Sequence, residues 1–292
     1  MKKQTSKKKR NQKLKKKLAS MTALVLVLAV GVWGTLAYLS TLSVKKENTF
    51  TGSSGIKLEV EETNWDNTGR DKANSYTPNM SIAKDPKLKN TNVADGKSEY
   101  VAMRIDFLDV SDSSNKTAIT YAQLLNVIKL INFNHSDWTL AAVKNTSVWT
   151  DKMSNNTNNI TNNCLYSSNA YVALTGMDEN IKNATSMIFL YTGIVSAQHN
   201  TSTLFDTIQI RNGYTSVVTD GTDTIAAEPI YAFTDASQTT PLDGSTETGK
   251  GFPKFQIDVL GAAVEADGSD GDGTIDSLDK AKTGLLNLLE NN

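Results

Sequence analysis

The side chains best suited to hold a cofactor lie near the C-terminal end of the chain. Residues 267–279 read DGSDGDGTIDSLD, in which carboxylates alternate with glycines. Calcium prefers several hard oxygen ligands arranged around a tight glycine turn. With Asp272 and Gly273 at the fifth and sixth positions of such a loop, four carboxylates take the third, fifth, ninth and twelfth positions: Asp270, Asp272, Asp276 and Asp279. The sequence therefore predicts no cofactor, with calcium as the one possible exception: the first position of the loop would be Gly268, which has no side-chain oxygen, and the twelfth is Asp where Glu is usual. The alternative is a plain acidic turn before a helix, whose N-terminus favours nearby carboxylates.

Residues for hydrolytic chemistry are scarce. The two histidines, His135 and His199, lie in polar stretches typical of turns, and neither belongs to the H-E-x-x-H pattern of a zinc-binding helix. A zinc site that joins both histidines to Asp137 is the alternative. No G-x-S-x-G motif and no phosphate-binding glycine loop occur. The sequence therefore predicts that the protein is not an enzyme, with a metallopeptidase as the alternative.

The N-terminal end has the order of a secretory signal. Ten of the first 17 residues are Lys or Arg, and none of them is acidic. An apolar run over residues 21–33 and a segment of small residues follow. This order predicts a signal peptide over residues 1–37, with cleavage between Ala37 and Tyr38. An uncleaved membrane anchor is the alternative, because residues 21–39 approach the length of a bilayer-spanning helix.

The net charge argues against one class of partner, and the cysteine content excludes one kind of stabilisation. The 292 residues carry a formal net charge of −1, but the chain after residue 37 has 20 Lys and Arg against 31 Asp and Glu. Such an acidic chain argues against a nucleic-acid partner, and we expect membrane contact only through the signal segment. The single cysteine, Cys164, excludes an intramolecular disulfide. A secreted protein of this kind must be stabilised by packing, by a metal or by assembly.

Short apolar stretches alternate with polar turn clusters, which is typical of an all-β protein. We expect strands over residues 56–60, 100–108, 187–191, 204–210 and 255–264. Two helices are expected, over residues 120–131 with Thr120 as N-cap and over residues 277–289. Polar loops are expected over residues 64–80, 151–170 and 235–251.

Several segments together resemble the TasA/camelysin-type exported proteins of Gram-positive bacteria, which a SipW-type signal peptidase processes. The segments that carry the resemblance are residues 34–50, 81–91 with Lys84-Asp85-Pro86, 100–105, 187–210 and 255–266. The resemblance implies that residues 56–292 form a jelly-roll-like antiparallel β-sandwich with one or two inserted or appended helices. It also implies a secreted protein of the extracellular matrix or cell surface.

Members of this family polymerise, so the resemblance implies fibres whose partners are further copies of the chain and other matrix proteins. In this mode the segment 38–55 of one copy adds as a strand to the next copy, since an open sheet edge accepts a strand. The side chains that would fill the grooves are Leu39, Leu42, Val44 and Phe50. Alternatively, the segment pairs within its own subunit or is a flexible leader. A camelysin-like surface metallopeptidase and a monomeric surface adhesin are the alternatives for the whole protein.

Overall fold

The computed structural model describes residues 47–48, 56–94, 96–112, 114–151, 177–242, 251–266 and 277–292. The strands are β1 (Glu47–Asn48), β2 (Leu58–Glu61), β3 (Ser81–Ala83), β4 (Lys87–Asn90), β5 (Glu99–Asp109), β6 (Thr117–Ala118), β7 (Ile128–Ile131), β8 (Trp138–Asn145), β9 (Val148–Asp151), β10 (Ala184–Tyr191), β11 (Thr207–Ile210), β12 (Val218–Asp220), β13 (Asp223–Ile225) and β14 (Phe255–Glu265). The helices are the π-helical turn η1 (Trp65–Gly69), α2 (Arg70–Asn74), α3 (Tyr121–Leu124), α6 (Glu179–Lys182) and α7 (Leu278–Glu290).

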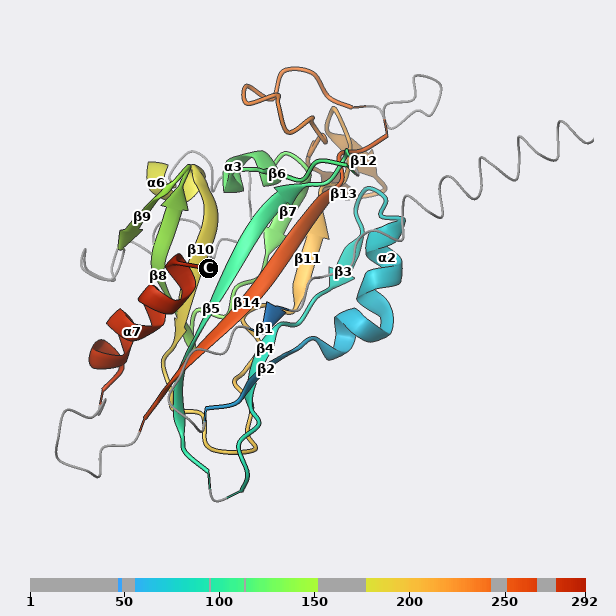
Figure 1. Cartoon of the computed structure of the whole chain (residues 1–292). Helices are drawn as coiled ribbons and strands as arrows, with labels where there is room; N and C mark the ends of the chain where they lie inside the picture. The colour runs from blue at the N-terminus through green and yellow to red at the C-terminus, as the bar shows by residue number, and fades with distance from the viewer. Residues whose placement is uncertain are drawn as a thin grey trace, which may run out of the picture. The chain divides into compact units, whose positions relative to one another are not determined.

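The largest sheet has the strand order β1-β14-β5-β10-β8-β9, with β6 paired to β5. Its long central strands β5 and β14 pair antiparallel over all of their eleven residues, from Phe255 opposite Asp109 to Glu265 opposite Glu99. Figure 1 shows these two strands side by side through the middle of the molecule. Of the expected fold class, the described residues confirm a mostly β chain with antiparallel sheets and a few short helices.

Both faces of this sheet are buried. Side chains alternate between the two faces of a strand, and in β5 Met103 and Ile105 enter the main core while Tyr100 and Ala102 enter a second one. The main core also contains residues of the small sheets β3-β11-β7 and β2-β4. The strands expected over residues 100–108 and 255–264 are therefore confirmed as the centre of the fold.

Helix α7 covers the second face. Its buried residues recur at helical spacing, and they are Ala281, Leu285, Leu286 and Leu289. Ser277 begins the helix as its N-cap, because its hydroxyl accepts a hydrogen bond from the backbone N–H of Lys280 at 3.4 Å. The helix expected over residues 277–289 is confirmed. No helix among the described residues is long and apolar enough to cross a membrane.

The helix expected over residues 120–131 is wrong beyond its first turn. Thr120 does cap α3, and it exchanges two hydrogen bonds with Gln123, at 3.1 and 2.8 Å. The helix ends at Leu124, and the buried side chain of Asn126 donates to the carbonyl oxygens of Ala232 and Asp235. Residues 128–131 form β7, whose pairing with β11 supersedes the helical pattern.

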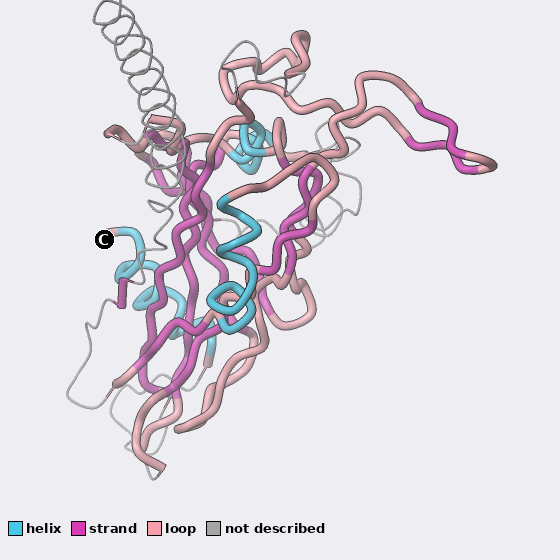
Figure 2. Tube along the Cα trace, turned by 90° about the vertical axis from the view of Figure 1, so that its right-hand side faces the viewer, coloured by secondary structure: helices cyan, strands magenta, loops and turns pink. Residues whose placement is uncertain are grey.

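The loop expected over residues 64–80 is also wrong, because η1 and α2 occupy residues 65–74. The strand expected over residues 204–210 is shorter and begins at Thr207. Strands β12 and β13 form a separate two-stranded sheet that extends away from the rest of the described chain (Figure 2). The expected loop over residues 235–251 is irregular where it is described, at 235–242 and 251, and residues 152–170 lie outside the described residues.

Candidate functional site

The outer edge of β14 is the candidate site for strand exchange. One side of β14 pairs with β5 along its whole length. The other side pairs with β1 at two positions only, where Glu47 lies opposite Leu260 and Asn48 lies opposite Gly261. Among the described strands no other one joins this edge. An edge of this kind offers backbone N–H and C=O groups to an added strand.

Glycine at position 261 lets the β2–β4 sheet approach β14 closely. A methyl group added to Gly261 would lie 2.6 Å from Cδ2 of Leu88 and 3.0 Å from Cδ2 of Leu58. Strands β2 and β4 pair antiparallel, and Leu58 and Leu88 both belong to the main core. The face of β14 therefore has β2 and β4 packed against it at the same residue where β1 pairs with its edge (Figure 1).

Lys57, near the start of the described residues 56–94, is held by backbone hydrogen bonds. The carbonyl oxygen of Lys57 accepts a hydrogen bond from the backbone N–H of Thr91 at 2.8 Å. The backbone of Lys57 also hydrogen-bonds the carboxylate of Glu99, the first residue of β5. We refer to these contacts of Lys57 as the Lys57 anchor.

Glu99 is a buried carboxylate at this anchor. Its Oε1 accepts a hydrogen bond from Nδ2 of Asn92 at 2.9 Å, whereas its Oε2 has no hydrogen-bond partner among the described residues. Burial raises the pKa of Glu99 to about 7, although hydrogen bonds from the Lys57 backbone and Asn92 oppose the rise. The Glu99 carboxyl, which accepts a hydrogen bond from the Lys57 backbone, therefore loses its proton near neutral pH.

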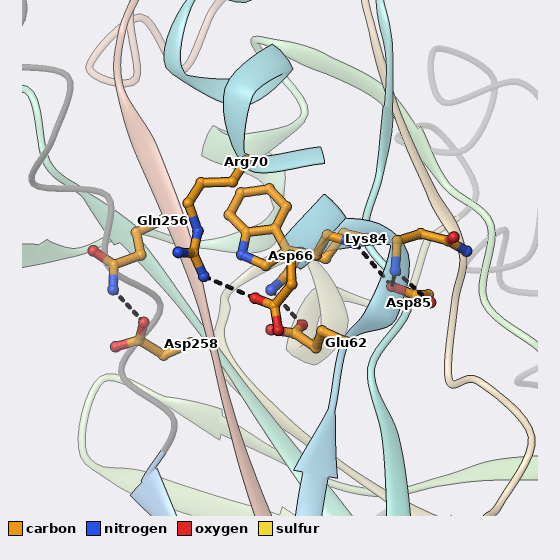
Figure 3. Close-up of polar contacts among 9 residues, drawn as sticks. Glu62, Asp66, Arg70, Lys84, Asp85, Gln256 and Asp258 are labelled. Carbon is orange, nitrogen blue, oxygen red and sulfur yellow. Dashed lines mark hydrogen bonds and ion pairs between the residues drawn. The ribbon is translucent and has the colours of Figure 1, made fainter. Parts of the chain in front are cut away.

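Lys84 and Asp85 of the Lys-Asp-Pro segment form a buried polar cluster beside β14 (Figure 3). Asp85 accepts hydrogen bonds from the backbone N–H groups of Asn64 at 2.8 Å and of Trp65 at 3.1 Å, and so caps η1. Lys84 Nζ lies 2.6 Å from Oε1 of Glu62. Sequence reasoning used this segment only as a mark of resemblance. The sequence does contain a signal for this cluster, because the charged residues Lys84 and Asp85 stand between two short strands with apolar residues.

Most of the sequence-predicted site residues lie outside the described residues. These are Ala37 and Tyr38 of the cleavage site, the donor residues Leu39, Leu42, Val44 and Phe50, the calcium candidates Asp270, Asp272 and Asp276, and the single cysteine, Cys164. The fourth calcium candidate, Asp279, is exposed in the first turn of α7. That position agrees with the alternative of an acidic helix N-terminus.

The two histidines lie on the surface of the described chain. His135 is exposed in the turn before β8, and His199 is exposed with its Nδ1 2.9 Å from the carbonyl oxygen of Ala197. Hydrogen bonds from Ser202 and Asn134 lower the pKa of Asp137. No group of three or more His, Cys, Asp or Glu within the described part of the chain has the arrangement of a metal site.

Comparisons with known proteins return no relative. No family model matches this chain, and no curated protein and no solved structure matches it.

Proposed function

We propose that this chain is an exported structural protein of the extracellular matrix or cell surface, which assembles into fibres by N-terminal strand donation. The observation that carries the proposal is the parallel pairing of β1 with the outer edge of β14. This pairing comes from within the segment 38–55 and occupies an edge that no other described strand joins. A segment that can lie on this edge in its own chain can lie on the same edge of another copy.

Exchange between copies replaces one pairing by an identical one. The backbone hydrogen bonds lost within a chain are regained between chains. The equilibrium between monomer and polymer therefore depends on protein concentration and on the conformational entropy of the segment 38–55. Because donor and acceptor are different surfaces of the same chain, the contact is head-to-tail and does not close upon itself. Repetition of this contact gives a filament.

The resemblance to TasA/camelysin-type proteins supports the same proposal from the sequence side. It implies a SipW-type signal peptidase that releases residues 1–37, a jelly-roll-like arrangement of the sandwich, and co-assembly with other matrix proteins. The side chains proposed to enter the acceptor edge remain Leu39, Leu42, Val44 and Phe50. Calcium at Asp270, Asp272, Asp276 and Asp279 is an accessory proposal, tested by adding calcium or a chelator to the assembly.

The test compares protein that begins at Tyr38 with protein that begins at Gly55. Light scattering and negative-stain microscopy follow assembly over a range of protein concentration. We expect filaments from the longer form and monomers from the shorter form. A synthetic peptide of residues 38–55, added to the shorter form, should bind it without producing filaments, because the peptide supplies a donor but no further acceptor.

Filaments from neither form would contradict the proposal. A stable monomer that binds cells or glycans would then favour the adhesin. Peptide cleavage that a chelator abolishes would favour the metallopeptidase.

A further inference from the structure

Lys84 and Glu62 form an ion pair that is sealed from solvent. Lys84 Nζ lies 2.6 Å from Oε1 of Glu62, and the two side chains are 2% and 0% exposed. Figure 3 shows the two side chains pointing toward one another, joined by a dashed line. Removing two opposite charges from water is unfavourable, and their attraction only partly offsets this penalty. Such a pair therefore gains from any change that removes both charges.

The pair lies against the main core and is incompletely hydrogen-bonded. Lys84 Nζ lies 4.7 Å from the centroid of the Trp65 ring, and Trp65 belongs to the main core. Oε2 of Glu62 is buried and has no hydrogen-bond partner among the described residues. The buried Nε1 of Trp65 likewise has no partner there. The two residues that contact the amine of Lys84 thus contain one orphan acceptor and one orphan donor.

The pair also joins two separate sheets. Glu62 directly follows β2 of the β2–β4 sheet, and Lys84 directly follows β3 of the β3-β11-β7 sheet. The two residues are 22 positions apart in the sequence. A covalent bond here would close the segment that contains η1 and α2, as a disulfide would in a chain with more than one cysteine.

We propose that Lys84 and Glu62 condense to form an intramolecular amide bond. The reactive form of the pair has the shared proton on Glu62, so that a neutral amine faces a carboxylic acid. Lys84 Nζ attacks Cδ of Glu62, the Nζ–Cδ bond forms, and the Cδ–OH bond breaks. The hydroxyl leaves with one proton of the amine as water. No oxidant, reductant or further reactant is required.

Two features of the site favour this reaction. The amine and the acid are held in contact, and fixed proximity raises the effective concentration of reacting groups by many orders of magnitude. Exclusion of solvent opposes the reverse reaction, because hydrolysis needs water at the amide. The product replaces two buried charges by one neutral amide. The amide oxygen is a hydrogen-bond acceptor, and the buried Nε1 of Trp65 is a donor that has no acceptor among the described residues.

The test is a tryptic digest of the unfolded, full-length protein analysed by mass spectrometry. Trypsin cuts after Lys and Arg, so an unmodified chain gives separate peptides 58–70 and 73–84. We expect instead one branched species that joins peptide 58–70 to peptide 73–87 and is lighter than their sum by one water molecule. Lys84 is not cut in this species, and fragmentation places the branch on Glu62 and Lys84.

The same digest contains a matched control. Lys89 Nζ lies 3.0 Å from Oε1 of Glu61, but this pair is 33% and 25% exposed. We expect normal cleavage after Lys89, because solvent keeps that pair charged. The variant Lys84→Arg, which keeps the charge but has no primary amine, should give only linear peptides. Separate linear peptides 58–70 and 73–84 from the unmutated protein would overturn the proposal, whatever the variant does.

Discussion

Asn48 lies opposite Gly261 in the parallel pairing of β1 with β14, and Leu58 and Leu88 pack against the same glycine. Gly261 thus pairs with β1 at the edge of the large sheet, and the β2–β4 sheet packs on the face of the same residue. The absent side chain at position 261 allows the contact with the β2–β4 sheet. Sequence changes here should affect the stability of the fold and the proposed strand exchange together.

Gly261→Ala should destabilise the protein by about 1–3 kcal/mol, the usual effect of overpacking a core. The added methyl group would lie 2.6 Å from Cδ2 of Leu88, so the β2–β4 sheet would have to move away from β14. Urea unfolding of the monomer measures the change. Gly251→Ala is the control, because a methyl group there meets nothing within 4 Å. Equal stability of the two variants would show that β2 and β4 do not pack closely on β14.

The buried carboxyl of Glu99 should make the fold less stable as the pH rises from 4.5 to 7. Its folded pKa of about 7 lies above the ordinary value of 4.5, so in this window the folded state holds a proton that the unfolded state has released. The full shift corresponds to about 3 kcal/mol, which is lost progressively across the window.

Glu99→Gln should remove this part of the pH dependence, because the amide does not titrate. Unfolding free energies measured on both sides of the window test this, with exposed Glu59→Gln as the control. A Glu99→Gln slope as steep as that of the unmutated protein would contradict a raised pKa at Glu99.

Asp85→Ala should destabilise the protein by about 3 kcal/mol, because it removes hydrogen bonds from two backbone N–H groups to a buried carboxylate. These donors are the N–H groups of Asn64 and Trp65 at the start of η1. The matched control is Asp66→Ala, which breaks an exposed ion pair with Arg70 on the next helical turn. That change should stay within about 0.5 kcal/mol. Similar effects of the two substitutions on thermal unfolding would argue against the capping role of Asp85.

Thr120→Ala should destabilise the fold by about 1 kcal/mol through loss of the α3 cap. Thr120 Oγ1 accepts from the N–H of Gln123 at 3.1 Å, and Gln123 Oε1 accepts from the N–H of Thr120 at 2.8 Å. Exposed Thr117→Ala on β6 is the control. Thermal unfolding compares the two variants, and no difference between them would show that the capping box contributes little.

The elements that sequence reasoning located have a strong local pattern. Strands β5 and β14 alternate between two buried faces, and α7 has an apolar stripe behind a serine cap. The stretch 120–131 has an equally good helical pattern, but the buried amide of Asn126 and the pairing of β7 with β11 override it. Tertiary contacts of this kind cannot be predicted from the spacing of apolar residues in the sequence.

The candidate site was less accessible to sequence reasoning. The resemblance implies that the segment 38–55 is a strand donor, which stays a prediction, but nothing in its residues indicates the acceptor strand or a parallel register. The cluster around Lys84 was missed because Glu62 and Lys84 are 22 residues apart and meet only when two sheets pack. The helical residues 65–74 have few apolar side chains, so no stripe marked them.

Cysteine cross-linking tests directly whether the pairing of β1 with β14 exchanges between copies. Glu47 and Leu260 are partners across this pairing. One batch of protein carries Glu47→Cys and a second carries Leu260→Cys, and both carry Cys164→Ser. The batches are mixed under assembly conditions and oxidised. We predict disulfide-linked dimers that contain one copy of each variant and that become rarer on dilution. A doubly substituted chain that cross-links only within itself, together with no mixed dimers in filaments, would contradict strand donation.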